Sequence, residues 1–282
     1  MLARSGGIAA CGLVLALACG VRAESSSSQA STLRHRCEVA RELGRFDRAV
    51  VLCRRAVHAQ SSPENLVALS GALSSRGQGA DLDRAREIAD RALRVDPRHP
   101  AALLQRIQVA GLQQDLEGAE TILAAGDGGL DSSREAQARS LIAQLSLDRG
   151  RVREATEHAR RAVALDPELY EAYAVLARTG LETGDSSVLR IAAPAMLRLS
   201  PNGAYSHYVS GVVAMLDSRY GEARAHAERA RWLGMEPESC DELLAAIDRR
   251  APIARGALRP MGIALGVGAA LLLFLLGASA TL

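Results

Sequence analysis

The sequence predicts an all-α fold built from a repeated pair of helices, and three observations support this prediction. Aromatic residues make up only 3% of the 282 residues, which argues against a β-sandwich or β-barrel. Hydrophobic residues make up 48% and are rich in Ala and Leu, which favour helices. Similar residue types also recur at a spacing of 34 residues through the middle of the chain. A period of this length is typical of an α-solenoid of stacked helix pairs.

The N-terminus has the pattern of a secretory signal. Residues 1–23 contain two Arg and no acidic residue, and an apolar run covers residues 6–21. The small residues Val21 and Ala23 fit cleavage after Ala23, so we expect residues 1–23 to be a signal peptide. One alternative is a lipoprotein signal, with Cys19 as the lipidated residue; another is an uncleaved anchor or no export. The Ser-rich residues 24–31 are predicted to form a flexible spacer.

The middle of the chain carries the 34-residue period. Gly and Pro recur at this spacing in the pairs Gly150 and Gly184, and Pro167 and Pro201. Small residues and a Gly follow a fixed order in the repeat that ends at Pro167: Ala143, Gly150, Ala155 and Ala162 occupy positions 8, 15, 20 and 27. This pattern resembles the tetratricopeptide repeat (TPR), a pair of antiparallel helices with small residues where the two helices cross. The resemblance implies a TPR-type α-solenoid.

Six such repeats cover residues 32–235, and the third repeat matches the pattern least well. The register slips by two residues within 74–80 and again within 126–133, both of which read as loops. Pro194 falls inside the second helix of repeat five, where it removes one backbone hydrogen bond and predicts a kink. We therefore expect six helix pairs with local irregularities, not a regular array.

The segment after the repeats divides into three parts. Residues 236–250 predict a more polar helix that would cap the array, because a solenoid needs a polar outer face at its end. Residues 251–260 are a linker with Arg and Pro. Residues 261–282 are uncharged and, at about 1.5 Å per residue, long enough as a helix to cross a hydrocarbon core of about 30 Å. They predict a transmembrane helix.

Several classes of chemistry are missing from the sequence. All 34 basic residues are Arg, so a mechanism that needs Lys is excluded. The six His show no metal-binding spacing, and the five Cys form no CxxC motif. Residues 24–260 hold 32 acidic residues beside 32 Arg, without the basic excess of a nucleic-acid binder. We expect no catalysis, cofactor, metal, small-molecule substrate or nucleic acid.

These features predict a non-catalytic, membrane-anchored scaffold that binds a protein or peptide in a concave groove. A working signal would place the repeats outside the cytoplasm, in a periplasm-like compartment. The arginines that precede the C-terminal span, Arg249, Arg250, Arg255 and Arg259, favour the opposite orientation by the positive-inside rule. A cytoplasm-facing, tail-anchored adaptor is therefore one alternative. The other is a lipoprotein that resembles the pilotins, which assist envelope assembly; the C-terminal span departs from that group.

The resemblance also places two candidate sites. Cys37 and Cys53 fall at positions 8 and 24 of repeat one, on facing sides of its two helices, so an oxidising compartment could link them. The alternative is two small buried free thiols. The TPR groove is lined by positions 2, 5, 9, 12 and 13 of each first helix. Repeat four places the neutral side chains Gln137, Ser140, Gln144 and Leu147 there.

Repeat six differs because its groove positions are aromatic and apolar. These residues are Tyr205, Tyr208, Val212, Met215 and Leu216. Tyr and Met are enriched at protein interfaces, so we take this set, the repeat-six patch, as the candidate partner-binding surface. The alternative is that the capping helix covers these side chains. No repeat has Asn at position 9, which the carboxylate clamp of chaperone-binding TPR proteins requires.

Overall fold

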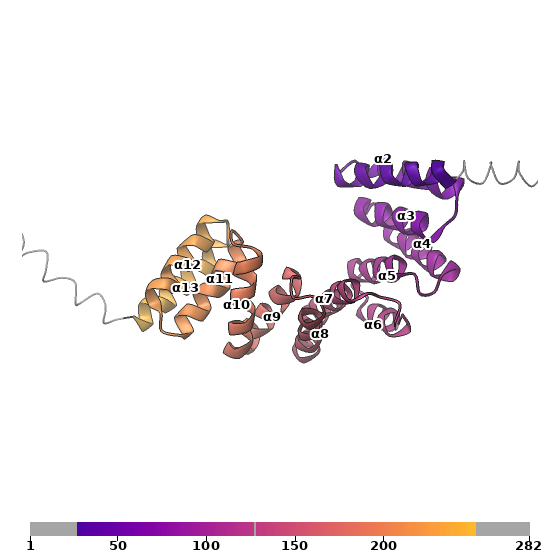
Figure 1. Cartoon of the computed structure of the whole chain (residues 1–282). Helices are drawn as coiled ribbons and strands as arrows, with labels where there is room; N and C mark the ends of the chain where they lie inside the picture. Colours follow the sequence, from indigo (N-terminus) through magenta and orange to yellow (C-terminus); the bar gives the residue numbers. More distant parts are fainter. Residues whose placement is uncertain (1–26, 127, 252–282) are drawn as a thin grey trace, which may run out of the picture. The chain divides into compact units, whose positions relative to one another are not determined.

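The computed structural model describes residues 27–126 and 128–251, and these residues fold into helices joined by short loops, without a strand (Figure 1). The expected signal peptide at 1–23 and membrane span at 261–282 lie outside the described residues, as does the linker after residue 251. Among the helices that are described, none combines the length and the apolar character needed to cross a bilayer.

The helices follow the spacing of the repeats. A helix at residues 27–42 comes first. The helices after it, with the labels of Figure 1, are α2 (Phe46–Ala59), α3 (Pro63–Arg76), α4 (Asp81–Val95), α5 (Pro100–Leu112), α6 (Leu116–Ala125), α7 (Ser132–Asp148), α8 (Val152–Leu165), α9 (Tyr170–Thr183), α10 (Ser186–Leu199), α11 (Ala204–Leu216), α12 (Tyr220–Trp232) and α13 (Pro237–Arg250). The chain forms two compact units, which divide within α9 between Thr179 and Gly180.

Small side chains fill the places where the helices of a pair cross. In the N-terminal unit, Ala143 on α7 and Ala155 on α8 are both fully buried. In the C-terminal unit, Gly211 on α11 faces Ala223 on α12, and a Cβ added at Gly211 would lie 3.3 Å from the carbonyl oxygen of Ala223. Larger side chains at these positions would push the helices apart, because protein interiors are close-packed. The period of small residues is therefore a requirement of helix packing.

The turn between the two helices of a pair needs a left-handed residue. Position 15 of the repeat has a positive φ in repeats one, four and five, where it is Gly44 (69°), Gly150 (73°) and Gly184 (71°). Repeats three and six have Gln114 (56°) and Ser218 (61°) at the same position. Gly adopts this conformation without steric cost, whereas a residue with a Cβ does not. The turn geometry is thus kept even where the residue type is unfavourable.

A buried ion pair joins the two helices of repeat two. Asp81, at the start of α4, is 1% exposed and accepts two hydrogen bonds from the Arg76 guanidinium, at 2.7 and 2.9 Å. The hydrogen bonds from Arg76 hold the pKa of Asp81 below its usual value, against the opposing effect of burial. Arg76 also donates to Asp47 on α2 at 3.2 Å. One arginine therefore ties α2, α3 and the start of α4 together.

The structure departs from the predicted spacer at residues 24–31. Its described part, residues 27–31, is helical. Ala30 is fully buried, and the hydroxyls of Ser31 and Thr32 each donate to the Ser28 carbonyl at 2.9 Å. Ser side chains that bond to the backbone are compatible with a first helical turn. Further along the chain, α10 continues through Pro194.

Candidate peptide-binding cleft

A cleft of about 580 Å³ lies on the N-terminal unit. It lies on the first helices of three successive repeats, α5, α7 and α9, together with the residue before α9. Its lining residues are Leu104, Gln108, Gln137, Ser140, Leu141, Gln144, Leu169, Tyr170, Glu171, Ala174, Val175 and Arg178. The volume falls within the range typical of ligand pockets.

The cleft combines an apolar surface with side-chain amides. Leu104, Leu141 and Leu169 are partly buried hydrophobic residues that line it. Gln108 and Gln137 are exposed at the same cleft. A glutamine amide can both donate to and accept from a peptide backbone. This surface can therefore hold apolar side chains of a bound segment and pair with its main chain.

Two charged groups set the electrostatics of the cleft. Arg178 on α9 pairs with Asp148 at the end of α7, with 3.3 Å between nitrogen and oxygen. Gln144 donates to the same Asp148 oxygen at 2.8 Å. Glu171 is exposed and forms no ion pair with any other described residue. Because the charge of Arg178 is matched by Asp148, Glu171 leaves a negative charge at the cleft and favours a basic group on the ligand.

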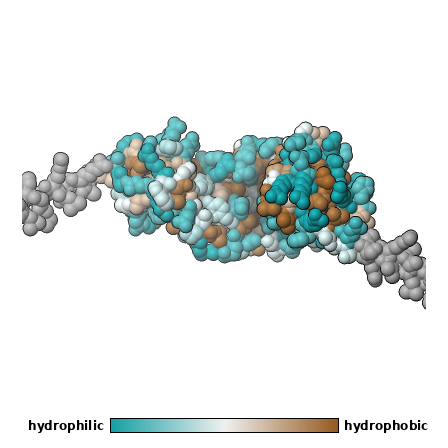
Figure 2. All heavy atoms as spheres, turned by 90° about the horizontal axis from the view of Figure 1, so that it is seen from above, coloured by the Kyte–Doolittle hydropathy of each residue, from teal (hydrophilic) through white to brown (hydrophobic). Residues whose placement is uncertain are grey.

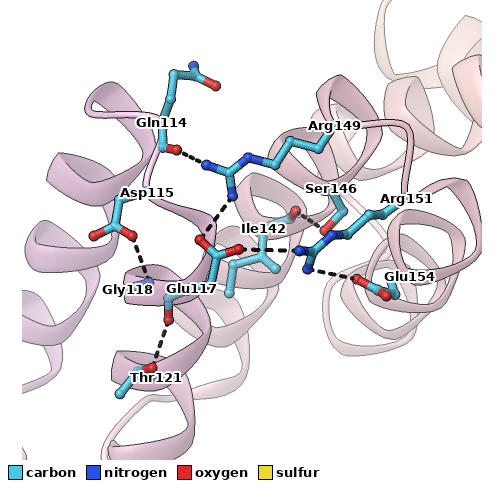
Figure 3. Close-up of polar contacts among 10 residues, drawn as sticks. All are labelled: Gln114, Asp115, Glu117, Gly118, Thr121, Ile142, Ser146, Arg149, Arg151 and Glu154. Carbon is cyan, nitrogen blue, oxygen red and sulfur yellow. Dashed lines mark hydrogen bonds and ion pairs between the residues drawn. The ribbon is translucent and has the colours of Figure 1, made fainter.

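A polar network links the repeats that carry the cleft (Figure 3). Arg149 and Arg151, in the turn between α7 and α8, both donate to the Glu117 carboxylate on α6, at 3.3 and 3.2 Å. Arg149 also bonds to the carbonyl of Gln114, and Arg151 pairs with Glu154 at 3.5 Å. Exposed ion pairs are weak one by one, but a network of them restricts geometry. This network ties repeat three to repeat four, whose first helices α5 and α7 carry the cleft.

In repeat four, the cleft is lined by residues that the sequence predicts to face the groove. Gln137, Ser140 and Gln144 all line it. Leu147 does not, because it is only 4% exposed and belongs to the core. Leu104 and Gln108 on α5, and Glu171, Ala174 and Arg178 on α9, hold the corresponding positions in repeats three and five. The repeat pattern predicts which positions face the groove. The residue types at these positions did not indicate that the cleft would lie on repeats three to five.

The repeat-six patch has a different environment. Tyr208, Val212 and Met215 pack, partly buried, against a cluster that includes Leu243 and Ile247 of α13. The rings of Tyr205 and Tyr208 are stacked with centroids 6.4 Å apart, and Leu216 stays 37% exposed. Burial raises the pKa of Tyr208 above its ordinary value. The capping helix thus supplies much of the packing for Tyr208, Val212 and Met215.

Cys37 and Cys53 form a disulfide in the structure, with their Cα atoms 5.5 Å apart. The bond joins the helix at residues 27–42 to α2. Both cysteines are almost completely buried. Cys240 on α13 is a buried free thiol whose pKa is raised by burial. Within the described residues, no group of three or more His, Cys, Asp or Glu side chains is arranged to hold a metal ion.

The comparisons with known proteins agree with this architecture. The family model described as "Tetratricopeptide repeat" matches residues 73–131, which span repeats two and three. The fold is a TPR-type helical repeat. TPR domains bind protein or peptide partners in a groove, and the cleft on α5, α7 and α9 lies on the first helices of three repeats. No curated protein matches the sequence.

Solved TPR structures resemble the chain at low sequence identity. The structure from a functional characterization of pilF from Pseudomonas aeruginosa is 16% identical, with a TM-score of 0.67, and covers 78% of this chain and 99% of its own. A TPR protein from Parabacteroides merdae is 18% identical, with a TM-score of 0.52 and coverages of 77% and 84%. YrrB, described as a TPR protein with an unusual peptide-binding site, is 16% identical, with a TM-score of 0.50 and coverages of 67% and 96%. These likenesses concern the fold alone.

Proposed function

We propose that this protein is a non-catalytic scaffold that binds an extended peptide segment of a partner protein in the cleft on α5, α7 and α9. The observation that carries this proposal is the cleft itself, which lies on the first helices of three successive repeats. Its apolar floor and its glutamines suit a peptide that offers apolar side chains and backbone hydrogen bonds. Glu171 favours a Lys or Arg in that peptide.

The second part of the proposal concerns location. Residues 261–282 would anchor the protein in a membrane, and a cleaved signal at 1–23 would place the repeats on the extracytoplasmic side. The Cys37–Cys53 bridge supports an oxidising compartment, because disulfides persist there and are rare in the cytosol. Protease added to intact spheroplasts should digest the repeats. Protection until lysis would place the repeats in the cytoplasm and overturn this part of the proposal.

The proposed binding role of the cleft can be tested by placing a large side chain in it. Gln137→Trp places a large ring at an exposed cleft position, so the helix should still fold while the ligand is excluded. Arg160→Trp adds the same ring at an exposed position of α8 that does not line the cleft. The full chain and both variants are used for affinity capture from detergent-solubilised membranes, followed by mass spectrometry.

We expect at least one protein to be captured by the wild type and by Arg160→Trp but lost with Gln137→Trp. A Glu171→Arg variant should weaken the same capture, because it reverses the charge that favours a basic ligand. If every captured protein is retained by Gln137→Trp, the cleft is not the binding site. Matching thermal melting curves of the two Trp variants would show that a loss does not come from unfolding.

A further inference from the structure

A second hollow lies on the first helix pair, on the helix at residues 27–42, on α2 and on the turn between them. It has a volume of about 350 Å³. Arg36, Arg45 and Arg48 line it together with Val39, Leu43 and Leu52. These six residues are called the N-terminal basic pocket below. The pocket shares no residue with the cleft on α5, α7 and α9, so it is a separate candidate site.

The arginines of this pocket lack counter-charges. None of the three forms an ion pair with another residue in the described part of the chain. Residues 27–59 contain seven Arg and only three acidic residues. Two of these acids are engaged elsewhere, because Glu38 pairs with Arg34 at 3.8 Å and Asp47 pairs with Arg76 at 3.2 Å. The charge of the pocket is therefore left for a partner to balance.

The pocket also offers an apolar contact. Leu52 is 7% exposed and forms a recessed floor, while Val39 and Leu43 are 39% and 62% exposed. A floor below a rim of arginines accepts an inserted side chain, whereas a flat lipid surface would touch only the rim. Large exposed apolar side chains beside unpaired arginines are typical of interaction surfaces. Shape and charge together favour an acidic peptide with an apolar anchor residue over an anionic membrane.

The disulfide holds the two sides of this pocket in place. Cys37 follows Arg36 directly, and Cys53 follows Leu52 directly. The bridge between them therefore fixes the distance between Arg36 on the first helix and Leu52 on α2. A preorganised site binds more tightly, because less conformational freedom is lost on binding.

We propose that the N-terminal basic pocket binds an acidic peptide segment of a partner, with carboxylates on Arg36, Arg45 and Arg48 and one apolar side chain between Val39, Leu43 and Leu52. This site is independent of the cleft and takes a ligand of opposite charge preference. A partner could engage both sites, or two partners could bind at once.

The test uses the full chain in an uncharged detergent and a fluorescent peptide of Glu, Asp and Leu residues, with binding followed by anisotropy. The triple variant Arg36→Gln, Arg45→Gln, Arg48→Gln should weaken binding at least about tenfold, because charge-assisted hydrogen bonds are lost. The matched control Arg86→Gln, Arg94→Gln, Arg160→Gln removes the same charge from exposed positions outside the pocket. It should change binding less than about twofold.

Two further arms separate the alternatives. Gln137→Trp in the cleft should leave the binding of the acidic peptide unchanged, so this test can fail while the proposed function of the cleft stands. Leu43→Ser should weaken binding, and a version of the peptide with Lys in place of each acid should not bind. Equal binding by both triple variants would overturn the proposal. So would failure of the peptide to bind while the full chain in phosphatidylglycerol nanodiscs, but not in phosphatidylcholine nanodiscs, shows protection of residues 36–52 from hydrogen exchange.

Discussion

Helices α7 and α11 hold the same place in their repeats, but their groove positions have different environments. On α7, Gln137, Ser140 and Gln144 line the cleft. On α11, Tyr208 and Met215 pack against the cluster that contains Leu243 and Ile247 of α13. The groove positions of one first helix therefore line an open cleft, whereas those of the other pack against α13, the last described helix.

The difference explains why the residue types differ. Side-chain amides suit a surface that stays in contact with water, and apolar side chains suit a surface covered by another helix. The large rings and Met of repeat six suggest an interface when read from the sequence, and in the structure they do form one, with α13 of the same chain. The residue types at the groove positions thus differ according to whether another helix covers them.

The largest expected effect on stability comes from weakening the packing of α13 against α11. Ile247 is 1% exposed, and Ile247→Ala should lower the free energy of unfolding of the C-terminal unit by about 3 kcal/mol, because it leaves a cavity. Hydrogen exchange of α11, α12 and α13 would measure this loss. Arg250→Ala on the exposed side of α13 is the control and should change the stability by less than about 0.5 kcal/mol. Unchanged exchange in Ile247→Ala would mean that α13 does not stabilise α11.

A smaller effect is expected within the patch. Tyr208→Ala should cost about 2 kcal/mol, since the ring is half-buried against the α13 cluster and stacked on Tyr205. Gln144→Ala, at a groove position of α7, should cost less than about 0.5 kcal/mol, as its amide lies at the open cleft. Urea unfolding gives both values. If Tyr208→Ala leaves stability unchanged and instead abolishes partner capture, the repeat-six patch is a binding surface and the comparison between the two helices fails.

The turns offer a test that does not involve the grooves. Ser218→Gly should stabilise the C-terminal unit by about 1 kcal/mol. The φ of 61° at this position is energetically unfavourable for a residue with a Cβ, but not for Gly. Gly150→Ala should destabilise the N-terminal unit by a similar amount, and no atom lies within 4 Å of the added Cβ to complicate the result. Thermal melting of both variants checks this pair. Changes of the same sign would contradict the conformational explanation.

The smallest effect is the alkaline titration of Tyr208. Burial raises its pKa above that of an unfolded chain, and the nearby Glu242 acts in the same direction. A raised folded pKa means that the contribution to stability is complete below the unfolded pKa, near 10, and is lost as the pH rises through the folded value. NMR of labelled tyrosine would follow this titration. In Ile247→Ala, the pKa of Tyr208 should move back towards its usual value, which links the titration to the packing of α13 against α11.

The sequence predicted the helix pairs well because small residues and turn glycines are local requirements that repeat. Ala143, Ala155 and Gly150 report the crossing and the turn directly. The repeat pattern also placed Gln137, Ser140 and Gln144 at groove positions, and these three residues line the cleft. The helical state of residues 27–31 is not predicted by the sequence, because a run of serines is typical of a spacer and the burial of Ala30 is not visible in it.

The packing of α13 against the groove residues of repeat six was harder to predict, because it depends on a contact between residues far apart in sequence. The spacing of Leu243 and Ile247, four residues apart on α13, was the available signal that this polar helix has one apolar face. The disulfide also depends on a contact between two helices. The spacing of Cys37 and Cys53 allows a bridge, but only the distance between the two helices decides it.

A disulfide stabilises the first helix pair, and the capping helix α13 stabilises the last one. Both features oppose local unfolding at the ends of the repeat array. In a linear array each pair contacts only its neighbours, so fraying ordinarily starts at the ends. Helix α6, in the interior, buries only Leu116 and Ala119 and follows the turn at Gln114, where φ is 56°. We therefore expect the array to open first at α6. Limited proteolysis should nick the chain near α6 first. Since α6 supports α5, a ligand in the cleft would slow that cleavage.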